Sequence, residues 1–442
     1  MKLNKISVEN LFGVFNHEIP INNERGTTII IGENGLGKTV ILEILESFFN
    51  SKFYYFNSVT FDKVLFEFID NVVWTITKEF HEETNENYIS VNTNAIESRS
   101  SFLIQTSDFN PQNLVRQARN LGSMLGMRRL ANTRWEDRRT GYIYNAEELI
   151  ERYAHLTTGY NFESQLEQNA PEWFTTRFNE LNVTLIETQR LLEIDHFENA
   201  PIETVKKYSG ELLELMKRNL TKSTELSSKL DRTYPNRLIK ELGERKKNIS
   251  DEMLNEKLNQ LEEKRKLMDR VGLTETEKDS TLLKIDNPEE VVKDVLMLYI
   301  KDSFEKLSIY DEISVKIELL LKIINERFKH KRMYVNKENG FSFKSTVIKK
   351  EGDFQEIPIE KLSSGEKNEL ILFYKLIFKT DSNSLILIDE PEISLHISWQ
   401  NKFISDLYEI HKLNKLDILI ATHSPDIISN NWDLSIELKG VE

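Results

Sequence analysis

Two short segments more than 300 residues apart carry residue types that can do chemistry together. In the first, the sequence from Gly32 to Thr39 fits the pattern G-x-x-x-x-G-K-[ST] of a phosphate-binding loop. Its glycines let consecutive backbone N–H groups turn toward an anion, and the helix expected after it points its positive end at the same place. Lys38 would pair with the β- and γ-phosphates of a nucleoside triphosphate, and the Thr39 hydroxyl would ligate magnesium. The residues expected to hold the nucleotide are Gly32, Glu33, Asn34, Gly35, Leu36, Gly37, Lys38 and Thr39.

The second segment is an apolar run, Leu385–Ile388, that closes on two carboxylates, Asp389 and Glu390. A buried strand presents its carboxyl end to a ligand crevice, so Asp389 is expected to hold magnesium, directly or through water. Glu390 would polarise the attacking water, and strand alternation would point it to the side opposite Asp389. The alternative is a surface turn that happens to carry two acids. Together with the phosphate loop, the pair predicts an enzyme that hydrolyses a nucleoside triphosphate.

Two further polar motifs precede or follow apolar elements. Ser363, Ser364 and Gly365 come before a helix expected to run to Phe378, and they offer two hydroxyls and free amides to an anion. Serine and glycine also cap helices that bind nothing. His423 follows the apolar strand Asp417–Ala421, so it could reach the same crevice and sense the γ-phosphate, although a lone histidine is more often structural.

The hydrophobic periodicity of the sequence predicts the strands and helices that position these polar groups. Residues 1–110 are strand-rich, and Thr27–Ile31 is a β-branched run that leads straight into the phosphate loop. Val40–Asn50 then has the spacing of a buried helix. These segments predict a strand, loop and helix unit with an antiparallel sheet appended. The strands expected in that sheet are Lys5–Leu11, Val59–Phe68, Asn71–Thr77 and Tyr88–Asn92.

The middle of the chain is rich in leucine, glutamate and lysine and is expected to be helical. Leu254, Leu258, Leu261 and Met268 fit a heptad seam, which predicts a short antiparallel arm or a dimer contact. Amphipathic helices packed on one another explain the same spacing. After residue 330 the period returns to two, and Lys337–Gly340 ends in the Asn-Gly pair of a hairpin turn.

We therefore expect three regions. Residues 1–200 form the N-terminal part of a nucleotide-binding domain, residues 201–330 a helical or short coiled-coil insertion, and residues 331–442 the C-terminal part of the domain. The chain has no cysteine, which excludes disulfides, thiolate metal sites and cysteine nucleophiles. No apolar stretch is long enough to span a bilayer and the N-terminus lacks a signal-peptide core, so a cytoplasmic protein is expected.

The net charge of −14 argues against a surface that coats nucleic acid. A local arginine cluster is the exception, and it is either a solvated, salt-bridged face or a contact for phosphates or an acidic partner. The cluster comprises Arg116, Arg119, Arg128, Arg129, Arg134, Arg138 and Arg139.

Taken in order, these motifs resemble those of an ABC-type ATPase head. The segment from Leu362 to Glu366 is similar to the family's L-S-G-G-Q signature, with Ser364 for the first glycine and Glu366 for the glutamine. His423 matches the switch histidine, Glu392–His396 resembles the D-loop, and Gln189 resembles the Q-loop glutamine, a ligand of nucleotide and metal. The resemblance implies a P-loop ABC ATPase head of α/β class that uses ATP and Mg²⁺. It also implies a dimer or higher homo-oligomer in which Ser363, Ser364 and Gly365 act in trans.

The wide separation of the motifs and the helical insert resemble the branch that holds RecF and the SMC proteins. Within it, the strings from Asp389 to His396 and from Ala421 to Pro425 resemble bacterial phage-defence ATPases of the PARIS-type AriA or Septu-type PtuA kind. Only 19 residues follow His423, too few for a TOPRIM nuclease domain. The resemblance therefore implies an ATPase sensor or scaffold that controls a separate effector, a nuclease, with a phage protein or nucleic acid as trigger. The alternative is a DNA-repair or DNA-end-binding ATPase.

Overall fold

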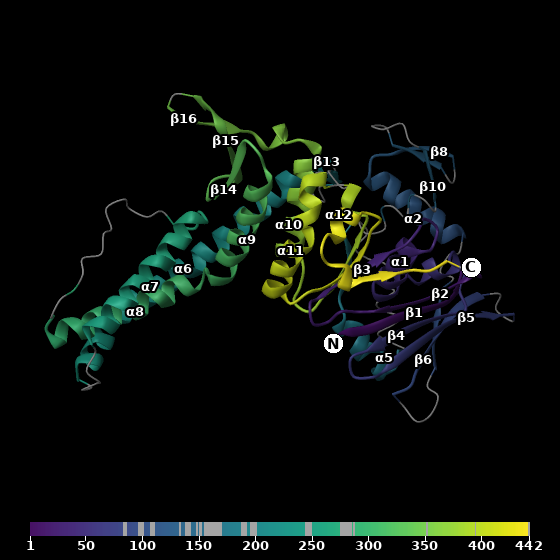
Figure 1. Ribbon diagram of the computed structural model, residues 1–442, viewed down its shortest axis with the longest axis horizontal. Helices are drawn as coiled ribbons and strands as arrows, with labels where there is room; N and C mark the ends of the chain where they lie inside the picture. The colour runs from purple at the N-terminus through teal and green to yellow at the C-terminus, as the bar shows by residue number, and fades with distance from the viewer. Residues whose placement is uncertain are drawn as a thin grey trace. The chain divides into compact units, whose positions relative to one another are not determined.

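The computed structural model describes residues 1–82, 86–95, 101–106, 111–131, 134–137, 143–146, 149, 153, 170–186, 192–194, 201–243, 250–274, 285, 288–350, 352–393 and 395–440. The chain divides into two compact units (Figure 1). The first combines Met1–Ile202 with Lys379–Glu442, and the second is Glu203–Phe378. Among the described helices, none combines the length and the apolar character that crossing a membrane requires.

The first unit is built on a five-stranded sheet in which all neighbouring strands are parallel. Its three central strands read as nearly continuous buried runs, as expected where helices cover a parallel sheet on both faces. Parallel pairing brings the carboxyl ends of the strands to one edge, and Asp389 lies opposite Ala421 in the register. In sheet order the strands are β11 (Val183–Ile186), β17 (Leu385–Asp389), β18 (Asp417–Ala421), β3 (Thr27–Ile31) and β19 (Ser435–Glu437).

Helices follow three of these strands at that edge. The predicted helix after the phosphate loop is confirmed as α1 (Lys38–Phe49), and α11 (Ile397–Asn414) joins β17 to β18. The short α12 (Pro425–Ile428) begins two residues after His423. Brief 3₁₀ helices η4 (Pro391–Ile393) and η5 (Trp432–Leu434) complete the connections.

The predicted antiparallel sheet is also confirmed, with six strands in the order β2-β1-β4-β5-β6-β7. The strand expected from Val59 begins only at Lys63, and the 3₁₀ helix η1 (Phe53–Asn57), with Phe53 and Phe56 buried, precedes it. Two strands of this sheet were not predicted, β2 and β7. The bounds are β1 (Leu3–Leu11), β2 (Phe15–Pro20), β4 (Lys63–Phe68), β5 (Val73–His81), β6 (Glu86–Thr93) and β7 (Ser101–Gln105).

An aromatic cluster fixes α1 against this second sheet. Phe48 of α1 is fully buried, and its ring meets Phe66, Trp74 and Phe174 edge to face. Phe174 belongs to α5 (Glu172–Glu180). Truncating a buried phenylalanine of this kind costs about 3–5 kcal/mol. The helix that follows the phosphate loop is therefore packed against the antiparallel sheet through Phe48.

The arginine cluster falls on a small separate core formed by Trp135, Tyr144 and neighbours of α2 (Pro111–Met124). Its strands are β8 (Arg128–Ala131), β9 (Arg134–Glu136) and β10 (Ile143–Asn145), and a two-stranded sheet joins β12 (Leu192–Ile194) to β13 (Pro201–Glu203). Four of the arginines are exposed, and one of them lies 3.9 Å from the Glu136 carboxylate. Arg138 and Arg139, and the side chain of Arg116, lie outside the described residues. The exposed four are Arg119, Arg128, Arg129 and Arg134.

The second unit is a helical assembly with a three-stranded sheet. Helices α6, α7 and α8 lie side by side (Figure 1), and the heptad-spaced Leu254 and Leu258 of α7 pack with Ile300 of α8. The whole predicted seam is buried inside this unit, as the packed-helix alternative expects. The helices are α6 (Thr204–Gly243), α7 (Asp251–Arg270), α8 (Glu290–Ser308), α9 (Asp311–Arg327) and α10 (Ser364–Phe378).

The predicted hairpin is confirmed as β14 (Lys331–Asn336) and β15 (Gly340–Lys350), with Gly340 at a φ of 69°. The strand β16 (Asp353–Ile357) and the 3₁₀ helix η3 (Ile359–Lys361) follow. The outer edge of β14 is held by Asn325 of α9, whose amide accepts from the Met333 N–H at 2.6 Å and donates to the Met333 carbonyl at 3.0 Å. The predicted fold class, an α/β P-loop head with an antiparallel sheet and a helical insertion, is confirmed.

Candidate functional site

The phosphate loop lies between β3 and α1, at the carboxyl edge of the parallel sheet. Gly35 and Gly37 adopt φ values of 88° and 89°, in the left-handed region that side chains disfavour. A Cβ on Gly37 would also lie 2.5 Å from a methyl carbon of Leu11. Left-handed residues in such a loop turn successive backbone N–H groups inward and create an anion-binding concavity. Both positions therefore favour glycine because of their backbone conformation, and at Gly37 there is also no room for a Cβ.

Lys38 is held inside this loop. Its Nζ donates to the carbonyl oxygens of Gly32 and Glu33, both at 2.9 Å, and only 6% of the residue is exposed. Burial lowers the pKa of Lys38, and the carboxylates Glu390, Asp389 and Glu392 act in the opposite direction. The Lys38 ammonium is therefore largely desolvated and lies in the field of three nearby acids.

Thr39 and Asp389 meet across the edge although 350 residues separate them, and the Thr39 Oγ1 donates to the Asp389 Oδ2 at 2.9 Å. Burial is the main cause that raises the pKa of Asp389, and Glu390 adds to it, whereas the Thr39 hydrogen bond and Lys38 lower it. A hydroxyl and a carboxylate oxygen this close are the hard donors that Mg²⁺ takes. Mg²⁺ is usually bound by one or two protein groups together with water and phosphate oxygens, so this donor set fits it.

Glu390 departs from the sequence expectation. The alternation that would place it opposite Asp389 does not apply, because β17 ends at Asp389 and Glu390 has a left-handed φ of 43°. Its backbone N–H donates to the Ala421 carbonyl at 2.9 Å. A non-glycine residue in this region costs about 1–2 kcal/mol, and such strain clusters at functional sites.

His423 faces Glu390 at this edge. The distance from its Nε2 to the Glu390 Oε1 is 3.8 Å, and both side chains are about one third exposed. A carboxylate and an imidazole so placed can hold a water between them and the loop. The structure thus brings together Lys38, Thr39, Asp389, Glu390 and His423.

Sequence reasoning missed the structural part played by Glu392, which it placed only within a D-loop-like string. The Glu392 Oε1 accepts from the His423 backbone N–H at 2.8 Å, and its Oε2 accepts from the Thr422 hydroxyl at 2.7 Å. The loop after β17 is thereby tied to the loop after β18. Nothing in the spacing of these residues signals a contact that only the parallel pairing creates.

Gln400 of α11 joins the same two loops. Its Oε1 accepts from the Ser424 hydroxyl at 2.6 Å, and its amide donates to the Leu395 carbonyl at 3.2 Å. The residue is buried. It had no signal in the sequence, since one glutamine on an amphipathic helix has no distinguishing pattern.

His17 of β2 supports the phosphate loop from behind. Its Nε2 lies 2.8 Å from the Leu36 carbonyl oxygen, and the residue is 3% exposed. Burial lowers the pKa of His17, while the bond to Leu36 works against it, so the ring is neutral and donates from Nε2. The antiparallel sheet therefore holds the phosphate loop through the Leu36 carbonyl.

The signature-like residues belong to the second unit. Ser363, Ser364 and Gly365 stand at the start of α10, which ends at Phe378 as predicted. Ser363 and Glu366 form a reciprocal capping box. The Ser363 N–H donates to the Glu366 Oε2 at 2.8 Å, and the Glu366 N–H donates to the Ser363 Oγ at 3.3 Å. The predicted Gln189 lies outside the described residues.

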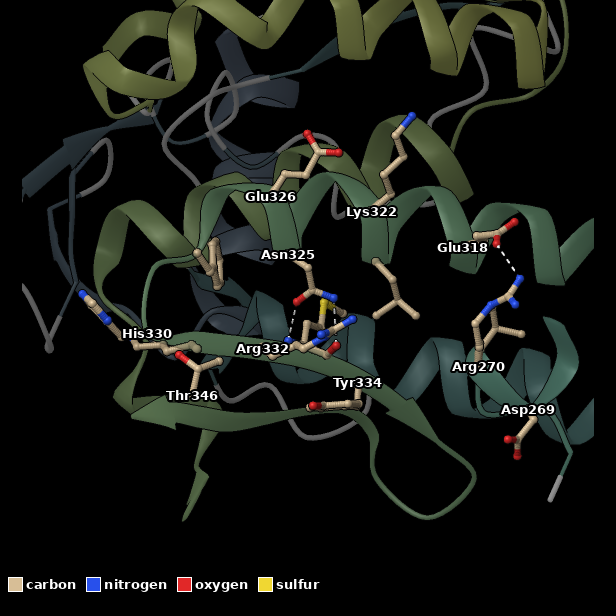
Figure 2. A pocket seen from close by; sticks show the side chains of 15 residues that line it. Asp269, Arg270, Glu318, Lys322, Asn325, Glu326, His330, Arg332, Tyr334 and Thr346 are labelled. Atoms are coloured by element: carbon tan, nitrogen blue, oxygen red, sulfur yellow. Dashed lines mark hydrogen bonds and ion pairs between the residues drawn. The ribbon is translucent and has the colours of Figure 1, made fainter. Parts of the chain in front are cut away.

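A cavity of about 760 Å³ in the second unit lies between α9 and the β14–β15 hairpin (Figure 2). It is lined by side chains of both charges, and Glu318 binds Arg270 across it at 3.4 Å. None of the predicted site residues lines it. The residues predicted to act on a nucleotide are thus separate from this cavity.

The chain matches a family profile described as AAA ATPase domain over residues 1–428. No curated protein matches it. Among solved structures, it is similar to the SMC head domain from Thermotoga maritima, at 10% identity over 100% of both chains with a TM-score of 0.32. It is also similar to an SMC head bound to the C-terminal winged-helix domain of ScpA, at 11% identity over 97% of this chain and 91% of that chain, with a TM-score of 0.31.

Proposed function

The chain belongs to the AAA ATPase domain family, and from this premise we propose that it hydrolyses Mg²⁺-bound ATP to ADP and phosphate at the edge of the parallel sheet. The observation that carries this proposal is the contact between Thr39 and Asp389, which joins the phosphate loop to the carboxylate strand at 2.9 Å. Two metal-ligand types meet there beside a buried lysine. A nucleotide-binding scaffold without turnover has no need of Glu390 in a strained conformation next to them.

The residues divide the work. The backbone N–H groups of Gly35 and Gly37 and the ammonium of Lys38 bind the β- and γ-phosphates. Thr39 and Asp389 would hold Mg²⁺, which would supply positive charge beside the phosphate oxygens. Glu390 accepts a hydrogen bond from the attacking water and orients it in line with the bond that breaks.

His423 completes the first half of the site. Its ring faces Glu390, and its backbone is held by Glu392, so contact of the ring with a γ-phosphate would be coupled to the loop after β17. The other half would come from a second copy, whose Ser363, Ser364 and Gly365 present a helix start to the same phosphate. The resemblance to ABC-type heads supports this dimer, as do the amides that a helix start leaves without intrahelical partners.

We place this ATPase in bacterial anti-phage defence, as a cytoplasmic sensor or scaffold that controls a separate nuclease effector. The support is the likeness of the strings around Glu390 and His423 to those of phage-defence ATPases. Co-expression with the product of the adjacent gene tests the proposal. A partner should co-purify, and Glu390→Gln should abolish protection from phage. The proposal would be wrong if the chain purified alone and the Glu390→Gln variant still protected cells from phage.

A DNA-end-binding ATPase is the second candidate. One observation favours it, the four exposed arginines of α2, β8 and β9. If they bind phosphates, DNA should raise the ATPase rate with a steep dependence on salt. Arg128→Glu combined with Arg129→Glu should then remove the stimulation and leave the basal rate unchanged. An ATPase rate that DNA does not alter at low salt would exclude this candidate.

A further inference from the structure

The signature-like turn carries an acid where the resembled motif has a neutral glutamine. In the second unit, Lys331 pairs with this acid. The Lys331 Nζ lies 2.6 Å from the Glu366 Oε2 and 2.8 Å from its Oε1. Both side chains are mostly covered, with exposed fractions of 21% for the lysine and 13% for the glutamate.

The ion pair is part of the turn itself. The Glu366 Oε2 also accepts from the Ser363 N–H, and the Glu366 N–H donates to the Ser363 Oγ. Because the Ser363 hydroxyl accepts in this box, its own hydrogen is available to an anion. Burial acts to raise the pKa of Glu366, but Lys331 and the Ser363 N–H outweigh it and hold that pKa below its usual value. The carboxylate is therefore ionised.

Lys331 is well placed to hold its partner. It is the first residue of β14, and the edge of that strand is fixed to α9 through Asn325, as Figure 2 shows. The strand pairs with β15, where Lys331 lies opposite Ser345. Because β14 is held in place by Asn325, the Lys331 ammonium has a fixed position beside the Glu366 carboxylate.

We infer that Lys331 is a positioning residue of the signature, which neutralises Glu366 and fixes the capping box so that Ser363 and the start of α10 can face the γ-phosphate bound by another copy. This inference rests on the proposed function. Without Lys331, an uncompensated carboxylate would stand one turn from an incoming triphosphate, and like charges repel strongly where water is excluded. The neutral ion pair of Lys331 and Glu366 would thus stand where the L-S-G-G-Q signature has one neutral glutamine.

The test uses the full chain in a Glu390→Gln background, so that ATP is bound and not consumed. Four proteins are compared: the background itself, Lys331→Met, Glu366→Gln, and the double variant. ATP-dependent dimerisation is measured by analytical ultracentrifugation, and ATP binding to the dilute protomer by a fluorescent ATP analogue.

Lys331→Met should weaken the ATP-dependent dimer about tenfold or more, because one unpaired charge at an interface costs at least that much affinity. ATP binding to the protomer should not change. The double variant should recover dimerisation to within about threefold of the background, since neutral glutamine needs no counterion. A merely structural lysine would not give this rescue together with unaltered nucleotide binding.

Lys344→Met is the matched control. Lys344 pairs with Asp353 at 2.7 Å on the same three-stranded sheet, and its loss should leave dimerisation unchanged. Thermal unfolding is followed for each protein. If Lys331→Met does not fold, Lys331→Arg and Lys331→Gln take its place, and only the arginine, which keeps the charge, should dimerise.

The outcomes are distinct. A background protein that stays monomeric with ATP overturns the proposed ATP-sandwiched dimer, and this inference falls with it. A background that dimerises, with a Lys331→Met variant that dimerises equally well or a double variant that is not rescued, overturns only the role of Lys331.

Discussion

The two regions that would face phosphate are built in opposite ways. At the sheet edge of the first unit, the decisive contacts join residues far apart in the chain, such as Thr39 with Asp389 across 350 positions. At the start of α10 in the second unit, Ser363 and Glu366 bond to each other across three positions, and Lys331 is 35 positions away. One region is made by sheet topology, the other by a local helix cap and one ion pair.

The difference teaches which region can bind alone. The sheet edge holds a buried cation, a loop with left-handed glycines and a hydroxyl–carboxylate pair of the kind that Mg²⁺ takes, all in one protomer. The signature offers hydroxyls and amides, but its nearby cation is already committed to Glu366. The first region should therefore bind ATP by itself, and the second should contribute only when two copies meet.

The largest effect should come from Glu390→Gln, which removes the carboxylate that orients water and keeps the shape. Phosphate release should fall about 10²–10⁴-fold, the usual contribution of a general base. ATP binding should persist, and a closed dimer should accumulate because the signature is untouched. The variant separates hydrolysis from binding, because it loses the hydrolysis of ATP while the sheet edge and the start of α10 both keep their phosphate-binding groups. A normal turnover rate in the variant would contradict the role of Glu390.

The next effect should come from Lys38→Ala. Losing charge-assisted hydrogen bonds of about 1.5–3 kcal/mol each should weaken ATP binding to the protomer by roughly 100-fold or more. Ser363→Ala is the matched variant in the other region, and it should leave protomer binding unchanged. Equilibrium titration with a fluorescent ATP analogue measures both. Equal losses in the two variants would break the division between the regions.

A smaller effect is expected from Glu392→Gln. The amide nitrogen cannot accept, so one of the bonds to Thr422 and His423 is lost, at about 1–3 kcal/mol. Because His423 is then loosely held, kcat should fall about tenfold with KM nearly constant. Glu409→Gln removes a carboxylate from the exposed side of α11 and serves as the control. Steady-state kinetics with an unchanged kcat for Glu392→Gln would show that the tie is dispensable.

The smallest effect concerns stability. Burial raises the pKa of Asp389 in the folded protein, so the charged form is disfavoured by folding. That cost is fully present above the raised pKa and shrinks as the pH falls from it toward the lower pKa of the unfolded chain. Asp389→Asn should therefore raise the melting temperature of the nucleotide-free protein by a few degrees at neutral pH, and the gain should shrink in acid. Thermal unfolding measures this, and a variant less stable than the native chain at neutral pH would oppose it.

Local patterns predicted much of the fold. Some elements can be recognised from about ten residues of sequence, because their periodicity or conformation is local. They are the run Thr27–Ile31, the glycines of the phosphate loop and the strand before Asp389. The hairpin at Gly340 was predictable for the same reason. The seam through Leu254 remained ambiguous, since periodicity says that a face is buried and not what buries it.

The rest of the site could not be read from sequence. Glu392 meets His423 because β17 and β18 pair, and His17 meets Leu36 because an antiparallel strand lies against the loop that follows β3. The left-handed turn at Glu390 depends on its bond to Ala421 of the neighbouring strand. The ion pair between Lys331 and Glu366 cannot be predicted from the sequence, because it forms only when α10 packs beside the β14–β15 hairpin. These contacts depend on tertiary pairing, which a single sequence does not specify.

The central claim is that the site at the sheet edge of one copy is completed by the signature of another, and mixing two inactive variants tests it. Lys38→Ala removes the first half. Gly365→Glu blocks the second, and a Cβ at Gly365 meets no other atom within 4 Å in the described part of the chain, so the fold should tolerate it. An equal mixture should regain roughly a quarter of the native ATPase rate, because half of the random symmetric pairs are mixed and each has one intact site. A mixture no more active than its two components would contradict the claim.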